Sequence, residues 1–363
     1  MSREFFWQMD RRDFLKLCGG VAAALGLSEV SVPKIAEVLA ASAAKPPVIW
    51  LELGSCTGDS CSFLNADSPT AAEVILNQLS VRYHEAIMAA QGTLAEKAIE
   101  DTIKNEAGKY VVVVEGVVPT KKGYGMIGGK EMQDILKEVS ANALVVIALG
   151  TCSAYGGIPG GDPNPGEVKP VMDLIDRNKV INLPGCPAHP MWLLSTVTHL
   201  LMFGMPKLDS QRRPVAIYGQ TIHDNCPRRS AFDEGRYVEQ FGQAEVDRDY
   251  CLIKKGCKGP ITYSNCPQQR WNSGKNWCIG AGAPCIGCVD PKFPDAMSPF
   301  YDRLPDIGIP GVAGLRTDAD TVGAVVGAAT AIGIAAHAVG AAAKGKLGRA
   351  DEAEKKSGKA SRA

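Results

Sequence analysis

Short, almost entirely apolar runs recur along the first 215 residues of the chain. Four of them are VIWLEL (48–53), VVVV (111–114), LVVIAL (144–149) and VINL (180–183), and a fifth strand is expected at 214–218. Unbroken apolar runs of this length are typical of strands buried on both faces. Helical patterns lie between them, for example at 70–79 and 130–139. This alternation predicts a parallel α/β sheet covered by helices.

Cysteines and one carboxylate follow these strands at the point where each one ends. Cys56 follows the first run, Glu115 ends the valine run, and Cys152 and Cys186 follow the next two. Carboxyl ends of parallel strands share one edge of the sheet, where ligands bind. A single cysteine there would be an ordinary buried residue, but three at equivalent strand ends predict a metal centre with Cys56, Cys152 and Cys186 as ligands.

Residues 223–288 contain seven cysteines and one histidine in two sets of four. The first set is His223, Cys226, Cys251 and Cys257, and the second is Cys266, Cys278, Cys285 and Cys288. Two sets of four soft ligands suit two metal centres, either zinc or iron–sulfur. Disulfides are the alternative in an exported chain, but they need no histidine. The surrounding residues 216–315 are rich in Gly and Pro, and metal binding would stabilise such a segment.

The two ends of the chain carry targeting features. Residues 10–16 (DRRDFLK) resemble a twin-arginine motif, an apolar run and Ala41-Ser42-Ala43 follow, and the mature chain is expected to start near Ala44. A soluble amphipathic helix is the alternative for residues 1–43.

Residues 321–343 carry no charge and are followed by Lys344 and Lys346, which predicts a transmembrane helix with its C-terminus on the cytoplasmic side. A helix packed on a partner is the alternative.

These features divide the chain into five parts. We expect a signal peptide at 1–43, a sheet domain at 44–215, a metal-binding domain at 216–315, an anchor helix at 316–345 and a polar tail at 346–363. The 39 basic and 39 acidic residues balance, so the charge gives no support for a nucleic-acid partner.

Taken together, the motifs resemble one family. They are RRDFLK, VIWLE with CTG, VEGVVP, GTCSAYGGI, PGCPAHP, YGQTIHDNCPRR, CLIKKGCKGP, NCPQQRWN and GAPCIGC. The chain is similar to the small subunit of a membrane-bound, uptake-type nickel–iron hydrogenase. The resemblance implies a flavodoxin-like domain followed by a loop-rich iron–sulfur domain and a C-terminal transmembrane helix.

The resemblance also implies a function. The nickel–iron site lies in a separate large subunit, so this chain holds no catalytic residue of its own. Three clusters would carry electrons from hydrogen oxidation to a membrane cytochrome b or other quinone-reactive subunit, at the periplasmic face of the cytoplasmic membrane. The rival interpretations are an iron–sulfur subunit of another respiratory oxidoreductase and a non-enzymatic, membrane-anchored zinc protein.

The same resemblance assigns the ligands, with two departures from the usual motifs. Cys56, Cys152 and Cys186 match the proximal cluster, with Glu115 beside it; His223, Cys226, Cys251 and Cys257 match the distal cluster; Cys266, Cys285 and Cys288 match the medial cluster. The usual fourth proximal cysteine is Asp59 here, and Cys61 lies two residues on, so either side chain is a candidate. Cys278 offers the medial cluster a fourth thiolate. We therefore expect three [4Fe–4S] clusters, or a [3Fe–4S] medial cluster if Cys278 is not a ligand.

A further departure concerns oxygen tolerance. Relatives with a four-iron, three-sulfur proximal cluster have two extra cysteines, and Gly58 and Gly157 occupy those positions here. The sequence does not support that cluster form.

Overall fold

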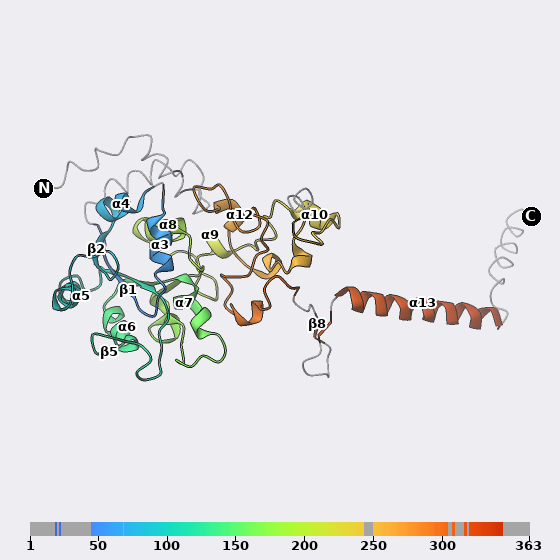
Figure 1. Ribbon diagram of the computed structural model, residues 1–363, viewed down its shortest axis with the longest axis horizontal. Coiled ribbons are helices and arrows are strands. Elements are labelled where there is room, and N and C mark those ends of the chain that lie inside the picture. The colour runs from blue at the N-terminus through green and yellow to red at the C-terminus, as the bar shows by residue number, and fades with distance from the viewer. Residues whose placement is uncertain are drawn as a thin grey trace, which may run out of the picture. The chain divides into compact units, whose positions relative to one another are not determined.

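The computed structural model (Figure 1) describes residues 19, 22, 45–67, 69–242, 250–303, 307–308, 316–317 and 319–343. The expected signal peptide, apart from Gly19 and Ala22, and the expected tail lie outside the described residues, so both stay predictions. The chain divides into two compact units, Met1–Arg303 and Leu304–Ala363.

A five-stranded parallel sheet forms the centre of the first unit. Its strands are β1 (Pro47–Glu52), β2 (Ser80–His84), β3 (Val111–Glu115), β6 (Val145–Leu149) and β7 (Val180–Leu183). All neighbouring pairs are parallel, in the order β2–β1–β3–β6–β7. This is the flavodoxin-like order, which reverses between β1 and β3. The four strands predicted from apolar runs are confirmed.

The fifth expected strand is wrong. Residues 214–218 form the short helix α9 (Val215–Tyr218), in which the Tyr218 N–H donates to the Pro214 carbonyl at 3.0 Å. A short apolar run fits a buried helical turn as well as a strand. The fifth strand of the sheet is instead β2, which the sequence did not predict. It lies at the edge of the described sheet beside β1 and leaves Arg82 exposed. As an edge strand it needs no unbroken apolar run.

The two faces of the sheet build two cores. Val48 and Trp50 pack on one face, whereas Ile49 and Leu51 pack on the other, as the alternation of a strand requires. The first face is covered by α3 (Gly58–Leu64) and α8 (Pro190–Phe203), and the second by α5 (Thr93–Asn105) and α6 (Met132–Ala141) (Figure 1). Burial on both faces explains why these strands are almost wholly apolar.

The helical patterns expected at 70–79 and 130–139 are both present. The first begins as α4 (Ala71–Glu73), where Thr70 and Glu73 form a capping box, and continues as the π-helix η3 (Val74–Gln78). The second corresponds to α6. A two-residue hairpin, β4 (Met126–Ile127) with β5 (Lys130–Glu131), precedes α6.

The described part of the first unit after residue 218 contains only short elements, as its Gly and Pro content predicts. They are α10 (Arg229–Asp233), η7 (Ile253–Lys255), η8 (Gly259–Ile261), α12 (Cys266–Gln269) and η9 (Asp295–Met297). Hydrogen bonds join this part to the sheet region: the indole of Trp192 donates to Asn265 at 2.7 Å, and the Thr151 hydroxyl donates to the Cys288 carbonyl at 2.5 Å. The two regions therefore fold as one unit.

The second unit contains a short hairpin and one long helix. The hairpin pairs β8 (Ile307–Gly308) with β9 (Arg316–Thr317), and α13 (Ala319–Ala343) has 25 residues. Among the helices that the structure describes, none is long and apolar enough to cross a membrane. The transmembrane helix expected at 321–343 is therefore not supported, although the segment is helical.

Candidate metal-cluster sites

The first candidate site lies at the carboxyl edge of the sheet, where the strand order reverses. Cys56 follows β1, Cys152 lies in α7 (Gly150–Tyr155) directly after β6, and Cys186 follows β7. The pKa of the Cys152 thiol is raised to about 12, mainly by burial and then by the charges of Cys186, Asp59 and Cys56. Because these groups act on one thiol, the structure brings together the three cysteines that the strand-end rule predicted.

Asp59 completes this group, and Cys61 does not. The Asp59 carboxylate is 9% exposed and accepts a hydrogen bond from the Ala188 N–H at 2.6 Å. Burial is the main cause that raises its pKa to about 7. A Cβ on Gly150 would lie 2.0 Å from the Asp59 Oδ2, so the left-handed glycine at 150 makes room for this side chain. Cys56, Asp59, Cys152 and Cys186 are called the edge site below.

Cys61 points elsewhere because of the helix that carries it. Two residues along α3 correspond to a rotation of roughly 200°, so positions 59 and 61 lie on opposite sides. Cys61 is exposed and lines a separate hollow of about 430 Å³ with His189 and Trp271. The structure therefore separates the two candidates that the sequence left equal.

Glu115 organises the loop that carries Cys56 and Asp59. Its carboxylate is 1% exposed and accepts five hydrogen bonds, at 2.5–3.1 Å. The donors are the Trp50 indole, the hydroxyls of Ser55 and Ser60, and the backbone N–H groups of Asp59 and Ser60. The last two belong to the first turn of α3, where a carboxylate also meets the positive end of the helix dipole. Glu115 thus fixes the start of α3.

The sequence did not indicate that a buried histidine, His84, lies next to the loop that Glu115 organises. The buried His84 ring contacts the Ser60 hydroxyl at 3.2 Å, and its Nδ1 lies 3.2 Å from Glu52. The Ala86 N–H donates to the same Nδ1 at 3.2 Å. Burial lowers the pKa of His84. Because β2 has no apolar run, nothing in the sequence placed His84 beside the loop.

The second candidate site is a cavity of about 380 Å³, lined by four cysteines of the 266–288 region. Cys266, Cys278, Cys285 and Cys288, called the cavity site below, share it with Cys186 and with apolar side chains such as Trp192, Ile222 and Trp277. Burial raises the pKa of Cys266 to about 11, with a further contribution from Cys278. The pKa values of Cys285 and Cys288 are raised too, mainly by burial and then by neighbouring thiols. Cys278 therefore lies with the other three.

The third candidate site gathers His223, Cys226, Cys251 and Cys257, called the histidine site below. Burial raises the pKa of all three thiols, and Cys251 and Cys226 add to the shift at Cys257. A Cβ on Gly259 would touch the Cys257 sulfur at 3.4 Å and the His223 backbone nitrogen at 3.8 Å, which places these two residues together. The Nε2 of His223 is buried and has no hydrogen-bond partner among the described residues.

Thiols of neighbouring sites lie close to one another and link the three sites in a row. Cys288 of the cavity site is influenced by Cys186 of the edge site, which also contributes a backbone hydrogen bond to it. Cys285 of the cavity site is influenced first, after burial, by Cys257 of the histidine site. The cavity site therefore lies between the other two.

These ligand sets supply the soft donors that iron–sulfur clusters use. In the part of the chain that the structure describes, no three His, Cys, Asp or Glu side chains surround one point as a mononuclear site requires. Cluster thiolates bind different irons and need not converge. Positive irons would hold the crowded thiols as thiolates, and the buried Nε2 of His223, which has no hydrogen-bond partner among the described residues, could serve as a nitrogen donor.

Gly58 and Gly157 lie directly against thiols of the edge site. A Cβ on Gly58 would be 3.0 Å from the Cys56 sulfur, and one on Gly157 would be 2.8 Å from the Cys152 sulfur. The two positions that the resemblance marks for extra cysteines therefore border the edge site. With glycine at both, they offer no additional ligand.

Comparisons with known families and proteins agree with this arrangement. Residues 218–301 match the family of C-terminal domains of the NiFe/NiFeSe hydrogenase small subunit, and residues 56–200 match the 20 kDa subunit family of NADH ubiquinone oxidoreductase. The chain is 42% identical over 297 residues to the periplasmic [NiFe] hydrogenase small subunit of Solidesulfovibrio fructosivorans, covering 81% of this chain and 93% of the relative. The chain belongs to the small-subunit family of NiFe hydrogenases.

Two further relatives extend the match of this hydrogenase small subunit. The quinone-reactive Ni/Fe-hydrogenase small chain of Wolinella succinogenes is 40% identical over 340 residues, covering 91% of this chain and 95% of the relative. The Ni-Fe-Se hydrogenase of Desulfomicrobium baculatum matches in structure with a TM-score of 0.67 at 37% identity, covering 72% of this chain and 100% of that chain. The rival relay of another respiratory enzyme loses support, because its family match ends before the histidine site.

Proposed function

We propose that this small subunit relays electrons from hydrogen oxidation at the nickel–iron site of the large subunit through three iron–sulfur clusters. The edge site would hold the proximal cluster, the cavity site the medial cluster and the histidine site the distal cluster. When bound, each cluster accepts one electron and passes it on. The observation that carries the proposal is the order of the sites: Cys186 of the edge site lines the same cavity as the cavity site, and Lys258, next to Cys257 of the histidine site, donates its backbone N–H to the Cys285 carbonyl at 2.7 Å.

In this proposal Asp59 is the fourth ligand of the proximal cluster. Its carboxylate acts on the thiols of Cys152 and Cys186 and accepts a hydrogen bond from the Ala188 N–H, and the glycine at 150 leaves room for it. A carboxylate is a harder ligand than the thiolate that it replaces. Cys61 lies on the other side of α3 and is not a ligand.

Cys278 and His223 complete the other two sets. Cys278 lines the same cavity as the three other thiols of the cavity site, which favours a four-iron medial cluster. His223 would bind the distal cluster through Nε2. Apolar side chains such as Trp192, Ile222 and Trp277 line the same cavity and would form the apolar side of the medial cluster's surroundings.

Iron analysis and electron paramagnetic resonance of the purified, oxidised heterodimer test the proposal. We expect about twelve irons per small subunit and no three-iron signal, with four-iron signals on reduction. Fewer than about ten irons would contradict three clusters. A three-iron signal in the oxidised complex would exclude Cys278 as a ligand. A colourless protein that contains zinc would overturn the relay itself.

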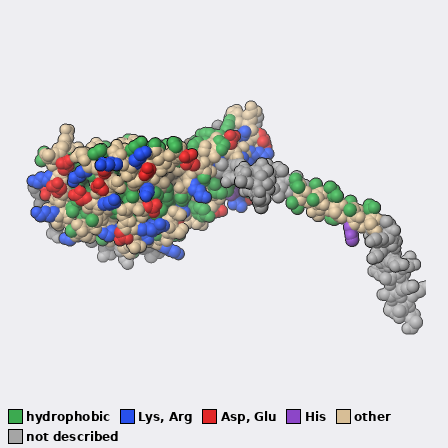
Figure 2. Space-filling view, turned by 90° about the horizontal axis from the view of Figure 1, so that it is seen from below, with side chains coloured by type: hydrophobic (Ala, Val, Ile, Leu, Met, Phe, Trp, Pro, Cys, Tyr) green, Lys and Arg blue, Asp and Glu red, His purple; other side chains and the backbone are tan. Residues whose placement is uncertain are grey.

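We also propose that the heterodimer works at the periplasmic face of the membrane with a quinone-reactive partner such as a cytochrome b. Relatives named periplasmic and quinone-reactive support this. So does α13, whose exposed side chains include Val325, Ile332 and Val339 at 64%, 70% and 69% exposure. Figure 2 shows the described surface of α13 covered by hydrophobic and small side chains, with one histidine and no charged group. This surface would bind the apolar helices of the membrane partner.

Truncation of the chain before Ala319 tests the location and the attachment together. The truncated heterodimer should appear in the soluble periplasmic fraction, because the apolar surface of α13 is gone, and it should still oxidise hydrogen with a small dye. Cell fractionation followed by a dye-reduction assay measures both. Truncated protein that still sediments with the membranes would refute attachment through α13, and truncated protein in the cytoplasm would refute the location.

A further inference from the structure

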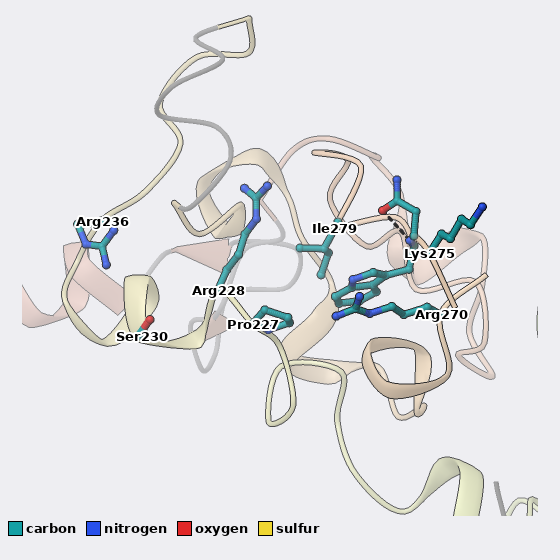
Figure 3. A pocket seen from close by; sticks show the side chains of 10 residues that line it. Pro227, Arg228, Ser230, Arg236, Arg270, Lys275 and Ile279 are labelled. Carbon is teal, nitrogen blue, oxygen red and sulfur yellow. Dashed lines mark hydrogen bonds between the residues drawn. The ribbon is translucent and has the colours of Figure 1, made fainter. Parts of the chain in front are cut away.

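A basic pocket lies beside the histidine site, outside the three ligand sets. It has a volume of about 520 Å³ and is formed by two segments, one around α10 and one after α12. Figure 3 shows Arg236 and Ser230 on one side of the pocket, Arg270 and Lys275 on the other, and Arg228 between them.

The charged side chains among the described residues that line the pocket are all positive. Of the ten described residues that line it, four are Arg or Lys and none is Asp or Glu. The whole chain, by contrast, has 39 basic and 39 acidic residues. Such a local excess in a hollow focuses a positive potential and attracts anions. The described lining of the pocket therefore carries an excess of positive charge in a chain that is neutral overall.

Three of the four cationic groups are held in place by the protein itself. The Arg228 guanidinium donates to the Tyr250 carbonyl at 2.8 Å, and Arg236 donates to Glu234 at 2.7 Å while lying over the Tyr250 ring at 5.3 Å. Arg270 donates to the Pro267 carbonyl at 3.4 Å. Groups that are already ordered lose less conformational entropy when a partner binds.

The position of the pocket connects it to electron transfer. Pro227 and Arg228 directly follow Cys226 of the histidine site, and Trp277 and Ile279 flank Cys278 of the cavity site. Trp277 is 6% exposed and packs in the small core that includes Cys226, Cys257 and Cys285. One side of this core faces the thiols and the other faces the pocket. An acceptor bound here would lie beside the end of the relay.

We propose that this pocket docks a carboxylate-rich segment of the protein that accepts electrons from the small subunit. The inference rests on the proposed relay function and names the surface and the chemistry of its partner. Four cations, of which Arg236 also pairs with Glu234, lie on opposite sides of a 520 Å³ hollow and match several carboxylates along one segment better than a single small anion. Complementary charges of this kind mainly raise the rate of association and fix the orientation of a transient partner.

The test compares two electron acceptors for the intact heterodimer: a small uncharged dye, and membranes from cells that lack this chain but contain the acceptor. In the variant Arg270→Glu/Lys275→Glu, hydrogen-dependent quinone reduction in the membranes should fall about tenfold at low salt. The loss should shrink below about twofold at about 0.5 M salt, because exposed charges are then screened. Dye reduction should not change.

A matched control separates the pocket from net charge. Lys97→Glu/Lys137→Glu makes the same change in net charge on exposed residues of α5 and α6. It should leave quinone reduction unchanged, and an equal loss in this control would overturn the docking inference. If Arg270→Glu/Lys275→Glu lowers the yield of the heterodimer, Arg270→Gln/Lys275→Gln replaces it, with an expected loss of about threefold.

A competition experiment identifies the occupant. Poly-glutamate added at constant ionic strength should slow quinone reduction by the wild-type complex and leave the pocket variant unaffected. Inhibition by inorganic phosphate as strong as that by poly-glutamate would assign the pocket to a small anion and overturn the docking inference. Wild-type complex that reduces the dye but never the membrane quinone would overturn the relay to that acceptor, and the docking inference with it.

Discussion

Replacing Asp59 with alanine should remove the proximal cluster and stop hydrogen oxidation with every electron acceptor. Among the described residues, Asp59 is the only carboxylate that acts on both the Cys152 and the Cys186 thiols. Without it, the fourth corner of the edge site faces the methyl group of alanine. Loss of an outer-shell partner alone typically costs ten- to hundredfold in metal affinity or activity, so loss of a direct ligand should cost about a hundredfold or more.

The measurement is iron content together with dye-linked hydrogen oxidation of the purified heterodimer. Asp59→Ala should fall from about twelve to about eight irons per small subunit. Cys61→Ser is the matched control on the same helix and should keep both iron and activity, because Cys61 lines a separate hollow. The reverse pattern, with iron lost in Cys61→Ser and kept in Asp59→Ala, would make Cys61 the ligand.

A third variant separates the ligand role from a structural one. Asp59→Cys supplies the softer thiolate, so it should keep about twelve irons. The proximal cluster should then have a lower reduction potential, because a thiolate donates more electron density than a carboxylate. A potentiometric titration followed by electron paramagnetic resonance measures this. An unchanged potential in Asp59→Cys would mean that position 59 does not touch the cluster.

The sequence predicted the sheet where burial dictates composition. Residues 111–114 and 145–149 are apolar because both faces of the sheet are covered, and that requirement is visible without coordinates. At the edge of the sheet the requirement weakens. Ser80–His84 is covered less completely and has a mixed composition, so it was missed, and the apolar run at 214–218 was misassigned.

The ligands that depend on the topology of the sheet alone could also be predicted from the sequence. The strand-end rule gathered Cys56, Cys152 and Cys186 because their positions depend only on topology. The choice between Asp59 and Cys61 depends on where α3 begins and which way it faces, and both are set by Glu115, 56 residues away. Likewise the basic pocket joins residues near 230 with residues near 275, so no run of charge in the sequence indicated it.

Replacing Glu115 with alanine should destabilise the small subunit more than any substitution outside the ligand sets. The hydroxyls of Ser55 and Ser60 can turn to other partners, but three donors cannot: the Trp50 indole and the N–H groups of Asp59 and Ser60. Each buried donor left unsatisfied costs about 1–3 kcal/mol. The total of roughly 3–9 kcal/mol is a large share of the roughly 5–15 kcal/mol typical of a folded domain.

Thermal unfolding of the heterodimer measures this effect, with about 2–4 °C expected per kcal/mol for a chain of this size. Glu115→Ala should therefore melt at least about 6 °C lower, and its loss of order at the start of α3 should also lower the iron content of the edge site. Glu115→Gln keeps one acceptor oxygen but turns an NH2 toward the same donors, so it should fall between Glu115→Ala and the wild type.

Glu138→Ala is the matched control for this loss. Glu138 is an exposed carboxylate on α6 that pairs with Lys130 at 3.3 Å, and a surface pair of this kind contributes about 0.5 kcal/mol or less. Its removal should shift the melting temperature by about 2 °C at most. If Glu115→Ala shifts the melting temperature as little as Glu138→Ala does, then water or new partners satisfy the buried donors. The loop carrying Cys56 and Asp59 would then be ordered by its cluster and not by Glu115.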